Sequence, residues 1–138
     1  MIIPISPEQT YPLRRAVLRK NMPNEPHEFK GDFDDSAFHL GYFSNHEIVG
    51  VVTVLIVDNA AQIRGMAVDE NFQGKGIGAQ LVREAEILIE QKQVSRIWMN
   101  ARATAVSFYE KLGYSILGEC FEIEPIGPHY VMQKNIHS

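Results

Sequence analysis

The sequence has very little that could cross-link the chain or hold a metal ion. It contains one cysteine, Cys120, so no internal disulfide can form. Cys120 and the five histidines show no spacing that is typical of zinc ligands. A chain of 138 residues buries roughly two-thirds of its unfolded surface, which is enough for one core without a cross-link. We therefore expect a single domain over residues 1–138 and no metal site.

Excess positive charge and long apolar runs are also missing. Lys and Arg number 13 against 17 Asp and Glu, and the formal net charge of −4 argues against a general nucleic-acid binder. No apolar run approaches the length that spans a bilayer, and the N-terminus lacks the basic region and cleavage site of a signal peptide. We expect a cytoplasmic protein that binds neither nucleic acid nor membrane. A homodimer stays open as an alternative to a monomer.

The sequence does contain a glycine-rich turn between two apolar segments. An apolar strand ends at Val68, and residues 73–78 then turn the chain into a segment with helical periodicity. Gly74, Gly76 and Gly78 stand at alternate positions, where they remove the side chains that would keep a ligand from the backbone. Successive N–H groups and the helix N-terminus could then surround an anion. The pattern predicts a cradle for a pyrophosphate group.

Two common nucleotide motifs do not fit this turn. A Walker loop needs Ser or Thr after Gly-Lys, but Lys75 is followed by Gly76. The dinucleotide fingerprint is loosely matched by Gly74, Gly76 and Ala79, but it also needs an acidic residue at the end of the next strand, which here ends in Asn100. Glycine-rich turns also occur without any ligand, so a purely structural turn stays open for this hexapeptide taken alone.

A second motif lies downstream, where residues 105–114 read AVSFYEKLGY. Ala105, Phe108 and Leu112 form one face of a short helix, and Gly113 is typical of the residue that ends one. This stretch resembles the A-x-x-F-Y-x-K-x-G-F/Y signature of the GNAT acetyltransferase superfamily. The upstream Gln73-x-x-Gly76-x-Gly78 resembles the acetyl-coenzyme A loop of the same superfamily, Q/R-x-x-G-x-G/A.

The resemblance implies an α/β fold with a mixed, mainly antiparallel sheet flanked by helices. Strands 60–68 and 96–100 would run parallel and splay apart, so that the pantetheine arm of acetyl-coenzyme A enters the gap. The residues implied to contact this co-substrate are Met66, Ala67, Val68, Gln73, Gly74, Lys75, Gly76, Ile77, Gly78, Ala79, Asn100, Arg102, Ala105, Phe108 and Tyr109. Further strands are expected at 37–43, 48–57, 114–121 and 129–134, with a short helix at 103–112.

The implied reaction transfers an acetyl group to a primary amine of a small molecule or peptide, without a covalent enzyme intermediate. Tyr109 would donate a proton to the departing thiolate, and a backbone N–H within residues 66–68 would stabilise the oxyanion. Glu122 and His129 are candidates for accepting the ammonium proton. The alternatives are a solvated strand residue for Glu122 and a packing role for His129.

The N-terminal segment supplies the candidates on the acceptor side. Ser6 and Gln9 form a capping-box pattern, although the helix could instead start near Thr10, and Leu13, Ala16 and Val17 are expected to face inward. The basic residues Arg14, Arg15, Arg19 and Lys20 read as a solvated face that could hold an anionic acceptor group. By position alone, the candidate substrate contacts are Arg19, Phe29, Asp32 and Phe33.

Two departures from the family pattern matter. Many members carry Asn seven residues before the tyrosine, where this chain has Arg102, so either Asn100 takes over the pantetheine hydrogen bond or Arg102 meets a phosphate. The ending from Phe121 to Met132 is similar to the E-x-G-x-P-H-x-x-M ending of a bacterial branch typified by ElaA, with different spacing. A non-catalytic acyl-coenzyme A binding or regulatory module remains the alternative function.

Overall fold

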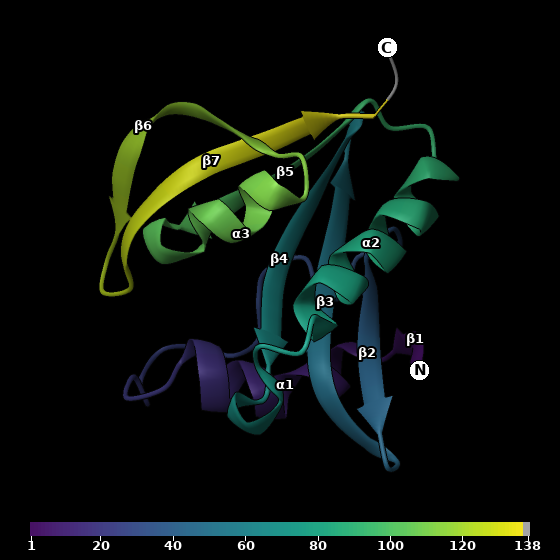
Figure 1. Cartoon of the computed structure of the whole chain (residues 1–138), viewed down its shortest axis with the longest axis vertical. Helices are drawn as coiled ribbons and strands as arrows, with labels where there is room; N and C mark the ends of the chain where they lie inside the picture. The colour runs from purple at the N-terminus through teal and green to yellow at the C-terminus, as the bar shows by residue number, and fades with distance from the viewer. Residues whose placement is uncertain (137–138) are drawn as a thin grey trace.

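A single seven-stranded sheet forms the frame of the protein, and the computed structural model describes residues 1–136 of the chain. The strands are β1 (Ile2–Ile5), β2 (Phe38–Ser44), β3 (Glu47–Val57), β4 (Ala60–Val68), β5 (Arg96–Arg102), β6 (Ser115–Ile123) and β7 (Gly127–Asn135). Their order across the sheet is β1-β2-β3-β4-β5-β7-β6. Within residues 1–136 only β4 and β5 pair in parallel, so the mixed, mainly antiparallel sheet expected from the sequence is confirmed (Figure 1).

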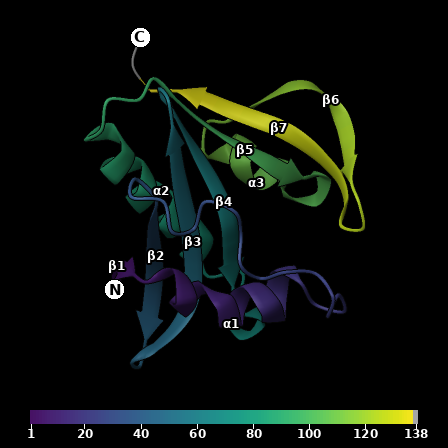
Figure 2. The same cartoon turned by 180° about the vertical axis from the view of Figure 1, so that it is seen from behind.

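Helices cover both faces of the N-terminal half of the sheet. α1 (Tyr11–Leu13) is the middle of a helical segment that spans residues 7–18, α2 is Ile77–Glu90 and α3 is Val106–Lys111. Figures 1 and 2 show α2 on one face of β2, β3 and β4, with α1 on the opposite face. Within residues 1–136, no helix has both the length and the apolar character needed to cross a membrane.

The parallel strands pair over a short distance and then separate. The register joins Ala60 to Arg96, Ala61 to Ile97 and Gln62 to Trp98. β4 then continues to Val68 and β5 to Arg102 without further pairing between them. The two halves of the sheet diverge from this point in Figure 1. Because the separated strands no longer bond to each other, backbone groups along their facing edges become available to a ligand.

The main core lies between α2 and the sheet. The buried residues of the α2 face are Ile77, Gly78, Leu81, Val82, Ala85 and Ile89. They pack against β3 and β4 residues such as Val52, Val54 and Ile63. Successive strand residues point to opposite faces, so Val51 packs on the other side, with Leu13 and Ala67. The helical periodicity seen in the sequence therefore identifies the buried face of α2.

The N-terminal helical segment confirms the predicted cap but not the predicted buried face. The Gln9 amide donates to Ser6 Oγ at 3.3 Å, and the Ser6 amide donates to Gln9 Oε1 at 2.8 Å, which is a capping box. Leu13 is buried as expected, but Ala16 is exposed and Arg14 is fully buried, so both of those expectations are wrong. Residues Arg14–Leu18 form a turn of π-helix. Its wider turn shifts every later side chain away from the positions that a regular helix would give.

Candidate active site

The glycine loop has the conformation that an anion cradle requires. Gly74 and Gly76 have φ angles of 79° and 81°, in the left-handed region that other residues rarely adopt. A Cβ atom built on either glycine would find no atom within 4 Å, so both face open space. Gly76 is also the N-cap of α2, and the first amides of that helix have no helical acceptor. The helix N-terminus therefore offers free N–H groups and a positive dipole end at this loop.

Gly78, unlike Gly74 and Gly76, allows close packing of side chains. A Cβ atom there would lie 3.3 Å from Met66 Cε and 3.4 Å from Phe108 Cζ. The missing side chain thus lets α2 approach β4 and α3. The Gln73 side chain holds the other end of the loop, because its Nε2 donates to the Val68 carbonyl oxygen at 2.9 Å.

A groove of about 450 Å³ runs along this loop; we call it the glycine-loop groove. Its lining includes the predicted residues Met66, Ala67, Val68, Gln73, Gly74, Gly76, Ile77, Gly78, Ala79 and Phe108. Lys75 does not line it, and its ammonium group lies 5.2 Å from the centre of the Phe72 ring. The groove joins the edge of β4 to the N-terminus of α2.

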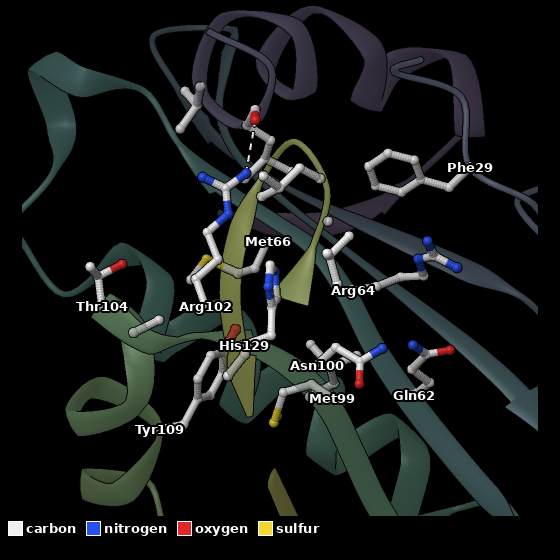
Figure 3. A pocket seen from close by; sticks show the side chains of 18 of the residues that line it. Phe29, Gln62, Arg64, Met66, Met99, Asn100, Arg102, Thr104, Tyr109 and His129 are labelled. Carbon is white, nitrogen blue, oxygen red and sulfur yellow. Dashed lines mark hydrogen bonds between the residues drawn. The ribbon is translucent and has the colours of Figure 1, made fainter. Parts of the chain in front are cut away.

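A second cavity of about 360 Å³ occupies the gap between β4 and β5; we call it the strand-gap pocket. Val17 and Met66 line both cavities, so the two meet at β4. Of the predicted site residues, the strand-gap pocket contains Arg19, Phe29, Met66, Asn100, Arg102, Ala105, Tyr109 and His129. Figure 3 labels six of them around the gap: Phe29, Met66, Asn100, Arg102, Tyr109 and His129.

The backbone of β4 is irregular where the two cavities meet. The β3–β4 register pairs Val51 with Ala67 and Thr53 with Arg64, which leaves Gly65 and Met66 together opposite Val52. This is a β-bulge, and Gly65 has the positive φ, 63°, that is common in one class of bulge. A bulge interrupts the regular hydrogen bonds of the ladder. The bulge lies in the region where the family resemblance implies a backbone donor to the oxyanion.

Tyr109 comes from α3 and is nearly buried. Its ring packs edge-on against Phe108 at 4.9 Å and Tyr114 at 5.9 Å between ring centres. Burial raises the pKa of the Tyr109 phenol to about 12, because the charged phenolate would lose its hydration. The hydroxyl group therefore stays protonated at neutral pH and is available as a proton donor.

His129 lies on β7 between Arg102 and Arg64 in Figure 3. Its Nδ1 is 2.7 Å from the carbonyl oxygen of Gly127. A carbonyl oxygen can only accept, so Nδ1 carries the hydrogen, and in the neutral ring Nε2 keeps a free electron pair. Within residues 1–136, Nε2 has no hydrogen-bond partner, and unlike most of the side chain this atom is accessible to solvent. His129 can thus accept a proton inside the pocket.

Glu122 does not reach this pocket, contrary to the placement expected from the sequence. Its neighbour Ile123 lines the pocket, and its other neighbour Phe121 packs against His129 at 6.0 Å between ring centres. Glu122 lies between them on β6, so strand alternation turns it to the opposite, exposed face.

Three arginines line the strand-gap pocket: Arg19, Arg64 and Arg102. Burial lowers the pKa of each guanidinium group, and the charge of Arg102 lowers that of Arg19 further. Among the described residues that line the pocket, none is Asp or Glu. In the part of the chain that the structure covers, none of the three forms an ion pair. The lining of the pocket therefore carries net positive charge, which Glu25 and Asp32 offset only in part and from outside the lining.

Arg64 was missed by the sequence analysis, and Arg102 faces this pocket rather than the glycine loop. Arg102 donates to the carbonyl oxygen of Leu18 at 2.8 Å, the bond drawn in Figure 3. A signal for Arg64 did exist. Gln62 and Arg64 flank the buried Ile63, so alternation along the strand places both on the pocket side.

The loop before β2 contributes Phe29 but not the other two predicted contacts. The guanidinium carbons of Arg19 and Arg64 lie 5.0 Å and 4.8 Å from the centre of the Phe29 ring. Asp32 is buried behind the pocket in an ion pair with Arg14. Phe33 is 59% exposed and borders a separate depression. The structure therefore brings Arg19 and Phe29 to the pocket and leaves Asp32 and Phe33 outside it.

Comparisons with known proteins agree with this geometry. A family model for the acetyltransferase (GNAT) domain matches residues 4–135. The chain is 33% identical over 141 aligned positions to the uncharacterized N-acetyltransferase YitI of Bacillus subtilis (strain 168), covering 97% of this chain and 95% of YitI. The crystal structure of ElaA from Escherichia coli superposes with a TM-score of 0.84 at 19% identity, over 97% of this chain and 98% of ElaA.

A further solved structure with the same fold is an aminoglycoside 6'-N-acetyltransferase complexed with coenzyme A. It superposes with a TM-score of 0.78 at 16% identity, over 98% of this chain and 96% of that one. The splayed strands, the glycine loop and the match over nearly the whole chain lead to one conclusion: this protein belongs to the GNAT family of acetyltransferases.

Proposed function

We propose that this protein transfers the acetyl group of acetyl-coenzyme A to the primary amine of a small molecule that also carries a carboxylate or phosphate group. The observation that carries the proposal is the charge of the strand-gap pocket. Arg19, Arg64 and Arg102 line it without a carboxylate among its described lining residues. Guanidinium groups bind carboxylates and phosphates through paired hydrogen bonds. An anionic acceptor would also relieve the repulsion and desolvation that lower the pKa of Arg19.

The same charge argues against a polycationic acceptor. One structural relative is an aminoglycoside acetyltransferase, and aminoglycosides carry several ammonium groups. A pocket for such a substrate needs carboxylates, because like charges at short distance repel. The strand-gap pocket offers arginines instead, so we assign this protein a different acceptor class.

The glycine-loop groove is the proposed site for the pyrophosphate and pantetheine of acetyl-coenzyme A. Gly74 and Gly76 leave room for a phosphate to approach the N-terminus of α2. The groove meets the strand-gap pocket at Met66, so a thioester carried along β4 would face an acceptor held in that pocket. Amides of the Gly65–Met66 bulge are the proposed donors to the oxyanion.

Proton transfers complete the proposed reaction. An alkyl ammonium with a pKa of about 10.4 is neutral in only roughly one part in 2,500 at pH 7, a handicap of about 4.6 kcal/mol. His129 Nε2 accepts the ammonium proton, and the free amine attacks the thioester carbonyl. The C–N bond forms, the tetrahedral intermediate collapses and the C–S bond breaks. Tyr109 then supplies the proton that the departing thiolate needs. The new N–H2⁺ group loses its extra proton, which restores the neutral phenol of Tyr109 after that residue has protonated the thiolate, and His129 returns the first proton to water.

Matched pairs of amines test the proposed acceptor class. β-Alanine and β-alaninamide differ in one carboxylate, and ethanolamine phosphate and ethanolamine differ in one phosphate. Thiol release from acetyl-coenzyme A gives kcat/KM for each. In at least one pair, we expect the kcat/KM of the amine that carries the carboxylate or phosphate to exceed that of its partner without this group by about tenfold or more. This is the scale of one good charge-assisted contact. A higher kcat/KM for the amines that lack a carboxylate or phosphate would contradict the proposal. Binding of coenzyme A without thiol release from any amine would favour the non-catalytic alternative.

A further inference from the structure

A closed network of polar side chains lies directly behind the strand-gap pocket. Arg14 and Asp32 have fully buried side chains, joined by two bonds of 2.6 Å and 2.9 Å. Arg14 also donates to Thr53 Oγ1 at 2.8 Å, and Thr53 Oγ1 is 2.7 Å from His39 Nδ1. His39 Nε2 lies 2.9 Å from the carbonyl oxygen of Asp32, and this hydrogen bond closes the ring. A carbonyl only accepts, so Nε2 carries the hydrogen, and in the neutral ring Nδ1 accepts a hydrogen bond from the Thr53 hydroxyl.

This network ends on Phe29, which lines the pocket. Asp32 Oδ2 accepts from the Phe29 amide at 2.8 Å, which closes the turn between the two residues. The guanidinium carbon of Arg14 lies 4.0 Å from the centre of the Phe29 ring. The Phe29 backbone and ring are therefore both held by the Arg14–Asp32 pair.

Phe29 in turn lies against the pocket arginines and the β4 bulge. Its ring centre is 5.0 Å from Arg19 and 4.8 Å from Arg64, measured to the guanidinium carbons. A Cβ atom on Gly65 would lie 3.1 Å from Phe29 Cε2 and 3.1 Å from Arg14 Nε. A side chain at residue 65 would therefore crowd this cluster, and the positive φ of 63° also favours glycine there. A displacement of Phe29 would therefore shift both guanidinium groups, because its ring packs against them.

Stability alone is a weak reason for such a pair. Buried ion pairs are often no more stabilising than apolar residues of similar size, because both charges lose their hydration. Here Arg14 Nε is the one buried side-chain nitrogen or oxygen in residues 1–136 without a hydrogen-bond partner, which is a further cost. Asp32 does have an electrostatic effect on the pocket, since it pairs with Arg14 and its charge also favours the charged form of Arg64, raising the Arg64 pKa against the burial that lowers it.

We infer that the Arg14–Asp32 pair is a positioning device for acceptor binding, which holds Phe29 so that Arg19 and Arg64 are aligned for an anionic group. This inference rests on the proposed function. Neither residue lines the pocket, so each acts through Phe29 and is not a catalytic residue.

Two conservative variants test the inference. Arg14→Lys keeps the charge but loses the planar group that stacks on Phe29 and pairs with Asp32. Asp32→Asn keeps an oxygen that can accept from the Phe29 amide but removes the charge. In each variant we expect the KM of the best anionic acceptor from the matched amine pairs to rise about tenfold, with the KM of acetyl-coenzyme A unchanged within about twofold. Either variant suffices if the other does not fold.

Ile89→Ala is the matched control for lost stability. Ile89 is fully buried on α2 and borders neither cavity, so its loss leaves a void in the core without touching the pocket. We expect a lower melting temperature with both KM values near those of the parent protein. Titration of inorganic phosphate into the coenzyme A-loaded proteins gives a readout without turnover, and the phosphate Kd should rise in the Arg14 and Asp32 variants only.

Arg64→Gln distinguishes failure of the positioning role from failure of the proposed function. If Arg64→Gln weakens acceptor binding while Arg14→Lys and Asp32→Asn keep parental acceptor KM and phosphate Kd, the positioning role is wrong and the anionic acceptor stands. If the two variants raise both KM values together, the pair is merely structural and the inference also fails. If the parent protein shows no preference for anionic amines and no phosphate binding, both proposals fall.

Discussion

The imidazole of His129 donates its Nδ1–H to the carbonyl oxygen of Gly127 at 2.7 Å. This bond sets the tautomer of the ring and directs its basic nitrogen away from the β6–β7 turn. His129 is buried and lines the strand-gap pocket, where we propose that it accepts the ammonium proton. The arrangement leads directly to a prediction about pH.

His129→Gln should lower kcat/KM by roughly 10²- to 10⁴-fold at neutral pH, the usual scale of general base catalysis. The loss should be largest at low pH and shrink toward pH 10, because the free amine then accumulates without help. Steady-state kinetics from pH 6 to 10 measure this. Glu122→Gln is the control, since Glu122 is exposed on the other face of β6, and it should follow the parent profile. A pH-independent change in KM alone for His129→Gln would mean that the residue only binds substrate.

Tyr109→Phe should reduce kcat by roughly 10²- to 10⁴-fold while the affinity for acetyl-coenzyme A changes little. The substitution keeps the ring that packs against Phe108 and Tyr114 and deletes only the hydroxyl group. Single-turnover kinetics with an identified acceptor give the rate of the chemical step. An unchanged rate under conditions where chemistry limits turnover would exclude Tyr109 as the acid.

Gly76→Val should weaken binding of coenzyme A by at least about tenfold, because the new side chain would occupy the open space where a phosphate is expected. Calorimetric titration with coenzyme A measures the effect. Gly118→Val is a closely matched control: Gly118 has a φ of 85° against 81° for Gly76, and it also faces open space, but it lies on β6. Both variants carry similar backbone strain, so equal affinities in the two would contradict the cradle.

Alkaline unfolding should report the burial of Tyr109. Its pKa is about 12 in the folded protein against 10.0 for a free phenol, so the unfolded state loses its proton first. The stabilisation is complete below pH 10 and is lost as the pH rises from 10 toward 12, by about 1.4 kcal/mol per pH unit. In Tyr109→Phe, the free energy of unfolding should therefore fall less steeply between pH 10 and 11.5, by about this amount per pH unit. Urea titration at each pH measures the free energy of unfolding.

In the Tyr109→Phe variant, Tyr114 still makes the free energy of unfolding fall as the pH rises. Burial, and then the nearby charge of Glu86, raise the pKa of Tyr114 as well. Adding Tyr114→Phe should therefore flatten the curve further. Parallel curves for Tyr109→Phe and the parent protein would show that Tyr109 is accessible to water in solution.

Local features of the sequence determined the glycine loop, the elements around it and the family. Residues 60–68 form one strand as predicted, and α2 starts at Ile77, directly after the turn. Glycines at positive φ, a capping box at Ser6 and helical spacing of apolar residues act over a few neighbouring residues, so they can be read along the chain. The two motifs were sufficient for the GNAT assignment for the same reason.

Tertiary structure decided which charged residues lie in the strand-gap pocket. Arg14 is buried at the start of the π-helical turn, where it pairs with Asp32, 18 residues further along the chain. The β6–β7 register is irregular between Leu117 and Phe121, so the face taken by Glu122 could not be counted along the strand. Arg64 and Arg102 line one pocket because β4 and β5 pair for three residues and then separate. Each outcome depends on contacts between distant segments, and burial of a charged group is favourable only where such a contact supplies its partner.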